Sequence, residues 1–97
     1  MARIMVWDEI NFGGYAAEFA DSVSDLSAKN GRGPIVGSQN WNDQISSWRV
    51  DTGQWQFFEH AGYGGVATKV YGPGECLNCV DAGLSNKWIS SIRKISD

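Results

Sequence analysis

The chain repeats a long pattern, and this repeat limits its fold more than any other feature of the sequence. The segment VWDEINFGGYAAEF, from Val6 to Phe19, aligns with FFEHAGYGGVATKV, from Phe57 to Val70, at an offset of 51 residues. Further along, NDQISSWR aligns with NKWISSIR at an offset of 44 residues. A repeat of this kind indicates two similar units that bury a common core between them.

The local chemistry of both copies predicts β-structure. Runs such as RIMVW, QWQFF and ATKVY are β-branched or aromatic and have the length of a strand. The pairs Gly13–Gly14 and Gly64–Gly65 supply the positive φ angles that a folded hairpin needs. We therefore expect an all-β chain in which two Greek-key motifs form a two-sheet β-sandwich. It should be a single domain over 1–97, with Greek keys at about 3–51 and 54–97.

Between the two patterns of the first half, the sequence predicts less regular structure. SVSDLSAKNG favours a short helical turn capped by Ser22 or Ser24. The Gly-rich segment from Ser27 to Trp41 is interpreted as a flexible insertion, with a partner-binding loop as the alternative. The tryptophans are expected to pack in the core or against turns; they are Trp7, Trp41, Trp48, Trp55 and Trp88.

Composition excludes several classes of function. A net charge of −3 without a basic cluster argues against nucleic-acid binding. No apolar run is long enough to span a membrane. The N-terminus lacks the apolar region of a signal peptide, which favours the cytosol, although a mature secreted domain would look the same. We expect a monomer, with weak self-association left open.

Catalysis is disfavoured because the titratable side chains are poorly placed for it. His60 is the sole histidine and lies in the predicted hairpin turn EHAGYGG. Cys76 and Cys79 form CLNC without a second cysteine pair or a nearby histidine, so a structural zinc site is incomplete. We interpret them as free thiols or an incidental local disulfide, in preference to a redox or metal role.

The repeated polar segments are rich in oxygen atoms that could bind a hard cation. NDQISS, from Asn42 to Ser47, carries an amide, a carboxylate, two hydroxyls and turn carbonyls. Ca²⁺ prefers six to eight such oxygens. In a strand that begins at Ile45, Ser46 and Ser47 point to opposite faces, so one hydroxyl can reach a cation while the other ties down backbone.

Both patterns resemble those of the βγ-crystallins, over almost the whole chain from Ile4 to Ile95. The resemblance to the family's aromatic-x4-aromatic-x-Gly hairpin lies at Trp7-x4-Phe12-x-Gly14 and Phe58-x4-Tyr63-x-Gly65. NDQISS and NKWISS resemble the N/D-N/D-x-x-S/T-S calcium motif of the microbial and invertebrate members. The resemblance implies a non-enzymatic, calcium-binding βγ-crystallin domain that Ca²⁺ stabilises.

The same resemblance implies two Ca²⁺ sites, each completed by the other loop. The first would use oxygens of Asp8, Gln44 and Ser46, together with a side chain at position 87. The second would use Glu59, Trp88 and Ser90, completed by the side chain of Asp43. Within these sets the contributions of Asp8, Gln44, Glu59 and Trp88 would be backbone carbonyls.

Lys87 departs from the motif, which has Asn or Asp at this position. Its ammonium offers three donors and no acceptor. At roughly 4 Å from a dication it would oppose binding by about 2 kcal/mol even in a water-like dielectric. We expect the long side chain to turn its ammonium into solvent and a water to fill the gap. The two sites should therefore be unequal, and the site that Asp43 completes should be the tighter.

Three other interpretations remain open from the sequence. Asn-Asp and Asn-Lys can be simple turn-formers that the serines cap, without any cation. The domain would then be a calcium-independent structural module that uses its Greek keys for packing or self-association. A secreted binding module, such as a lectin or a protease inhibitor, is the third class, and a Cys76–Cys79 disulfide would favour it.

Overall fold

The computed structural model describes residues 1–29, 40–85 and 87–97. Its regular elements within these residues are strands and short 3-10 helices. The strands are β1 (Arg3–Trp7), β2 (Ala16–Phe19), β3 (Ser47–Thr52), β4 (Gln54–His60), β5 (Gly64–Ala67), β6 (Gly74–Cys76) and β7 (Ser91–Ser96). The 3-10 helices are η1 (Ile10–Phe12), η2 (Leu26–Ala28) and η3 (Cys79–Ala82).

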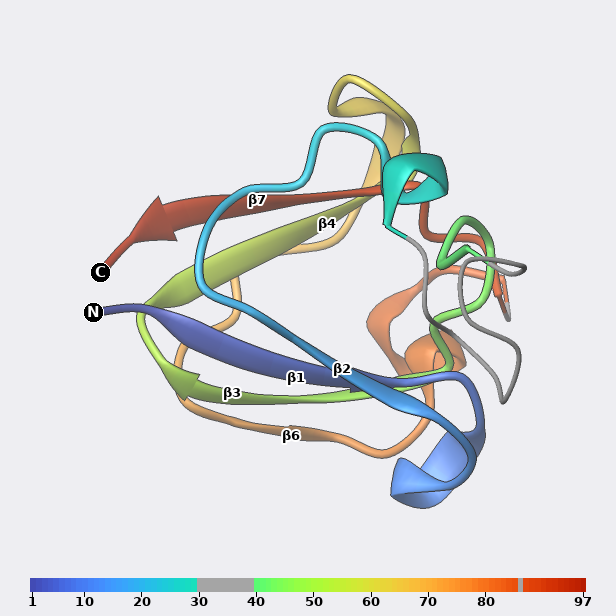
Figure 1. The fold of residues 1–97 in the computed structure, drawn as a ribbon, viewed down its shortest axis with the longest axis horizontal. Coiled ribbons are helices and arrows are strands. Elements are labelled where there is room, and N and C mark those ends of the chain that lie inside the picture. Colours follow the sequence, from blue (N-terminus) through green and yellow to red (C-terminus); the bar gives the residue numbers. More distant parts are fainter. Residues whose placement is uncertain (30–39, 86) are drawn as a thin grey trace.

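The strands form two antiparallel sheets that face each other (Figure 1). One sheet has the order β2-β1-β3-β6 and the other β5-β4-β7. The predicted all-β, two-sheet sandwich is therefore confirmed. Among the described residues the second sheet is a strand shorter than the first, and beside β7 it has a single bridge, between Val23 and Ile92.

The connections interlock the two halves of the chain. Strand β6 comes from the second half but pairs with β3 of the first sheet, through Trp48–Cys76, Arg49–Glu75 and Val50–Gly74. Conversely, the bridge at Val23 joins a segment of the first half to β7. Each sheet thus contains residues from both repeats, as Greek-key connections produce.

The core lies between the sheets and is rich in aromatic rings. Trp41, Trp48 and Trp55 are buried, as expected. Trp48 on β3 meets Phe57 on β4 with 4.0 Å between ring centroids, so this pair joins the two sheets. Such aromatic pairs contribute about 0.5–1.5 kcal/mol of stability beyond the contribution of the apolar area that they bury.

The helical turn predicted in the first half exists, but the predicted cap was wrong. It is η2, and its N-cap is Asp25, whose Oδ1 accepts from the Ser27 backbone N–H at 2.9 Å. A carboxylate one residue before the helix reaches this donor directly. The Ser22 hydroxyl is used elsewhere: it accepts from the Lys94 backbone N–H at 2.8 Å and so contacts β7. Most of the predicted insertion lies outside the described residues.

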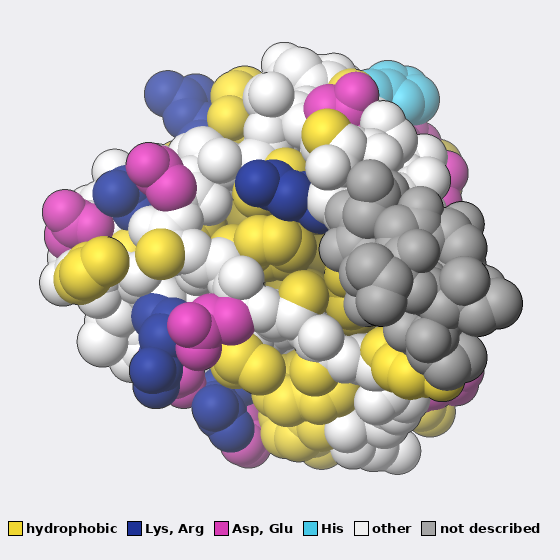
Figure 2. Space-filling model, in the orientation of Figure 1, with side chains coloured by type: hydrophobic (Ala, Val, Ile, Leu, Met, Phe, Trp, Pro, Cys, Tyr) yellow, Lys and Arg dark blue, Asp and Glu magenta, His cyan; other side chains and the backbone are white. Residues whose placement is uncertain are grey.

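The surface carries both signs of charge. On the face shown in Figure 2, Lys and Arg side chains alternate with Asp and Glu, and hydrophobic side chains gather between the two sheets. Among the described residues, no helix is long and apolar enough to cross a membrane.

Candidate metal centre

The two polar loops lie together at one end of the sandwich, away from the chain termini (Figure 1). The Asp43 backbone N–H donates to the Ile89 carbonyl at 3.0 Å, which joins the first loop to the second. Asp43 and Lys87 share a left-handed backbone, with φ of 56° and 58°. The repeat seen in the sequence is therefore a repeat in backbone geometry, and positions 43 and 87 are equivalent.

Each loop is attached to a hairpin through matched hydrogen bonds. Ser46 N–H donates to the Trp7 carbonyl and Ser90 N–H to the Phe58 carbonyl, both at 2.9 Å. These bonds place the first serine hydroxyl of each loop beside the residue that follows the hairpin aromatic. We expected a carbonyl ligand from that residue, Asp8 in one half and Glu59 in the other.

The second serine of each loop braces the hairpin backbone. Ser47 Oγ donates to the Glu9 carbonyl at 2.6 Å and accepts from the Phe12 N–H at 3.1 Å. Its counterpart Ser91 makes the same two bonds, at 2.6 and 3.1 Å, with residues of the second hairpin. Ser47 and Ser91 are therefore the serines that tie down backbone, and the first serine of each loop is the one left as a candidate cation ligand.

The second candidate site brings Asp43 and Ser90 together across the loops. Ser90 Oγ donates to Asp43 Oδ1 at 3.0 Å, although the two residues are 47 apart in sequence. The Glu59 carboxylate is turned the other way and accepts from the Val66 N–H at 3.3 Å. Glu59 would therefore face this site with its backbone carbonyl. Trp88 is half-buried and packs against the core.

The first candidate site holds the Lys87 ammonium, and the expectation that it turns into solvent is wrong. Lys87 Nζ donates to the Asp8 carbonyl and lies 3.5 Å from the Gln44 carbonyl. Ser46 Oγ donates to the same Asp8 carbonyl at 3.1 Å. A charged donor gains more from carbonyl acceptors than a neutral one, about 1.5–3 kcal/mol per bond. The ammonium therefore stays among the oxygens that we had assigned to a cation.

The Asp8 side chain is engaged away from this site, like that of Glu59. Asp8 Oδ1 accepts from the Tyr15 N–H at 2.9 Å and so closes the first hairpin. The Asp8 residue is buried, with 6% of its surface exposed. Both acidic residues thus support the hairpin turns with one carboxylate oxygen each.

These donor sets suit a hard cation at the second site and not at the first. Among the described residues, no three His, Cys, Asp or Glu side chains are grouped to hold a metal. A cation would rely on carbonyls, a hydroxyl and the Asp43 carboxylate, the oxygen ligands that Ca²⁺ accepts. The first site offers carbonyls and a hydroxyl but has an ammonium in place of the carboxylate, so a positive charge already lies among its oxygens.

Cys76 and Cys79 are both buried, and no disulfide joins them in the structure. Burial raises the pKa of both the Cys76 and the Cys79 thiol. The Cys79 backbone N–H donates to the Ser46 carbonyl at 2.8 Å, so the first residue of η3 is hydrogen-bonded to the first loop. This hydrogen bond was not foreseen, since the CLNC spacing alone does not indicate a backbone contact.

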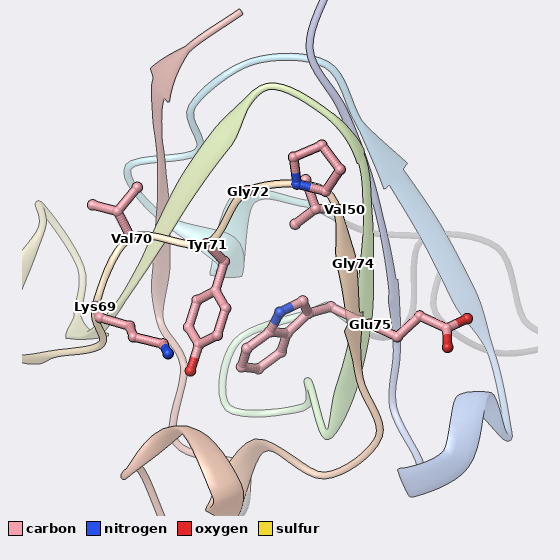
Figure 3. A pocket seen from close by; sticks show the side chains of 9 residues that line it. Val50, Lys69, Val70, Tyr71, Gly72, Gly74 and Glu75 are labelled. Carbon is pink, nitrogen blue, oxygen red and sulfur yellow. The ribbon is translucent and has the colours of Figure 1, made fainter.

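A surface cleft of about 370 Å³ lies elsewhere, between β3, β6 and the segment before β6. Figure 3 shows Lys69 beside the ring of Tyr71, with Glu75 pointing away from both. The Lys69 ammonium is 5.3 Å from the Tyr71 ring centroid. None of the seven predicted ligand residues lines this cleft.

Comparison with known proteins assigns the family. The family model described as Beta/Gamma crystallin matches residues 3–95. The chain belongs to the β/γ-crystallin family. A beta/gamma-crystallin of Ciona intestinalis is 30% identical over 94 residues, which are 97% of this chain and 99% of that protein.

Solved structures agree with this assignment of the chain as a βγ-crystallin. A betagamma-crystallin from an archaeon superposes with a TM-score of 0.79 and 33% identity, over 97% of this chain and 98% of the other. A transition-metal-ion-binding betagamma-crystallin from Methanosaeta thermophila superposes with a TM-score of 0.70 and 20% identity, over 95% and 99% of the two chains. At 20% identity, the similarity to the Methanosaeta protein shows only that the two chains share a fold.

Proposed function

We propose that this βγ-crystallin binds Ca²⁺ at the loop pair that Asp43 completes, is stabilised by that binding, and performs no chemistry. The observation that supports this most is the contact of Asp43 Oδ1 with Ser90 Oγ at 3.0 Å, which joins two loops far apart in sequence. A carboxylate and a hydroxyl at this distance can bind the same cation. Carbonyls of Glu59 and Trp88 would complete the protein's share, and water the rest.

Calcium is preferred to a transition metal because of the ligand atoms. The Methanosaeta relative is described as binding transition-metal ions, so members of this family can carry metal. Imidazole and thiolate are the ligands that favour those metals. The side chains proposed to bind the ion, Asp43 and Ser90, offer oxygen, and the sole histidine, His60, is exposed at the end of β4. An all-oxygen set with a single carboxylate favours Ca²⁺.

Binding should be unequal between the two loop pairs. We propose that the pair of Asp8, Gln44 and Ser46 binds Ca²⁺ weakly or not at all under physiological conditions, because the Lys87 ammonium lies among its oxygens. The functional stoichiometry would then be one ion per chain.

The proposal is tested by melting the protein in EDTA and in millimolar Ca²⁺, with calorimetric titration for stoichiometry. Binding to the folded state alone adds about 2.7 kcal/mol when Ca²⁺ exceeds its Kd 100-fold. For a domain of this size each kcal/mol raises Tm by roughly 4–8 °C. Asp43→Asn should remove most of the increase, whereas Asp81→Asn, a matched change at an exposed aspartate, should keep it.

A calcium-independent structural module is the second candidate. It is favoured by the bonds that Lys87 makes, since they hold one loop pair together without metal. An unchanged Tm in Ca²⁺, together with no heat of binding, would remove calcium from the function and favour this candidate.

A further inference from the structure

We infer that the Lys87 ammonium is a built-in cation of the first loop pair, which it holds closed in the absence of metal. Lys87 lies on the second loop, while its two acceptors, the carbonyls of Asp8 and Gln44, belong to the first hairpin and the first loop. One side chain therefore spans the three segments that a bound ion would otherwise join. The inference concerns the first loop pair, and it does not require that the second loop pair bind Ca²⁺ as proposed above.

The placement of Lys87 is specific rather than that of a mobile surface lysine. The residue is half-buried and its backbone is left-handed, with φ of 58°. Asp43 has the same conformation, and it too reaches across to the opposite loop, where it accepts from Ser90. Equivalent backbone positions thus direct an anion to one loop pair and a cation to the other.

The surrounding groups are arranged as acceptors for a positive charge. The Asp8 carbonyl receives both the ammonium and the Ser46 hydroxyl, which donates at 3.1 Å. A carbonyl oxygen has two lone pairs, so these two donors use its capacity. A cation could bind the Asp8 carbonyl only by displacing at least one of them.

Two consequences follow. The first loop pair should be ordered without Ca²⁺, so the metal-free domain should keep more of its stability than a chain with an anion at position 87. Lys87 also immediately precedes Trp88, so its anchorage fixes the start of the second candidate site. The cation that closes one loop pair would thereby help to shape the other.

Four variants test the inference: Lys87→Met, Lys87→Arg, Lys87→Asp and, as a control, Lys29→Met at an exposed lysine. In EDTA we expect Lys87→Met to lower Tm by about 4–8 °C or more, because it keeps the apolar stem and removes the charge. Lys87→Arg should retain part of that stability, and Lys29→Met should retain all of it. An EDTA melt of Lys87→Met that coincides with the wild type would overturn the inference.

The metal arm uses CaCl₂ titrations of the wild type and Lys87→Asp. We expect Lys87→Asp to bind one more Ca²⁺ than the wild type. A wild type that binds none and a variant that binds one would refute the proposed function and support the inference. A wild type that binds one and a variant that also binds only one would leave the proposed function standing and overturn the inference.

The wild type alone provides a third measurement, which does not depend on any variant folding. In ¹⁵N-labelled protein, an ammonium held by two carbonyls should exchange slowly enough to give a lysine side-chain NH₃⁺ signal near neutral pH. The exposed Lys29 should give none under the same conditions. The signal should vanish in Lys87→Met, and failure to detect any protected ammonium in the wild type would contradict the inference.

Discussion

At the scale of single residues, one substitution separates the chemistry of the two loop pairs. Positions 43 and 87 have the same backbone conformation, yet one carries a carboxylate and the other an ammonium. The sequence predicted that this difference would make the pairs unequal. The prediction that the ammonium turns into solvent was wrong, since its acceptors are backbone carbonyls, which every residue possesses and no motif displays.

A residue-scale prediction concerns the two cysteines. Burial raises the thiol pKa of Cys76 and Cys79, so the reactive thiolate is scarcer than at an exposed cysteine. At pH 8 the folded protein should react with a thiol reagent such as DTNB at least about tenfold more slowly than the chain in guanidinium chloride. The denatured chain should release two equivalents.

Rapid labelling of the folded protein would contradict that burial. Fewer than two free thiols in denaturant without reductant would instead indicate a disulfide. That result would favour the secreted binding module. Raising the pH toward the thiol pKa should speed the folded-state reaction, because the thiolate fraction rises as each proton is lost.

At the scale of elements, sequence patterns predicted the strands with unbroken β-branched or aromatic runs and misjudged one run that a polar side chain interrupts. RIMVW became β1 over its full length. ATKVY was predicted as one strand, but β5 ends at Ala67 and Tyr71 makes only a single bridge. Buried Thr68 explains the break, because its hydroxyl accepts from the Phe57 N–H and donates to the Lys69 carbonyl. The hydrogen bond from the Phe57 N–H is a tertiary contact, which the strand pattern of the sequence does not reveal.

The hairpin glycines provide an element-scale prediction with a control on the same hairpin. Gly65 and Gly62 have similar φ, 75° and 71°. A Cβ at Gly65 would lie 2.7 Å from Glu59 Oε1, whereas a Cβ at Gly62 would meet nothing within 4 Å. Both alanine variants should be strained by the left-handed backbone, but only Gly65→Ala also displaces a side chain that closes the turn.

We expect Gly65→Ala to cost about 1–3 kcal/mol and Gly62→Ala about 1 kcal/mol, measured by denaturant unfolding. If calcium binds as proposed, Gly65→Ala should also weaken it, because Glu59 is part of the hairpin that presents a carbonyl to the second site. Equal costs for the two variants would show that the close approach at Gly65 is unimportant.

At the scale of the whole molecule, the repeat predicted two similar units but not how far they depend on each other. The sheet assignment of β6 and of Val23 could not be deduced from the repeat, since each crosses to the sheet formed mainly by the other half. Strand patterns specify which face is apolar, and they leave the partner strand undetermined. The two loops contact each other directly, since the Asp43 backbone N–H donates to the Ile89 carbonyl.

The interlocked topology yields the last prediction, that neither half folds alone. A chain of residues 1–53 lacks the β6 edge of its sheet, and a chain of 54–97 lacks the segment that bridges Ile92. Each fragment would also lose the Trp48–Phe57 contact and expose the ring that it retains, Trp48 in one and Phe57 in the other. Both fragments should therefore unfold without a cooperative transition in circular dichroism, while the full chain melts cooperatively.

A circular permutant opened between Gly53 and Gln54 controls for the cut itself. The termini are close enough to be linked, since the Ala2 N–H donates to Asp97 Oδ1 at 3.2 Å. This permutant keeps every strand pair and should melt cooperatively, apart from a modest loss from breaking the tight β3–β4 turn. Cooperative melting of either separate fragment would show that a single Greek key suffices. The paired loops would then be an association of two independent units, and each could be assayed for calcium separately.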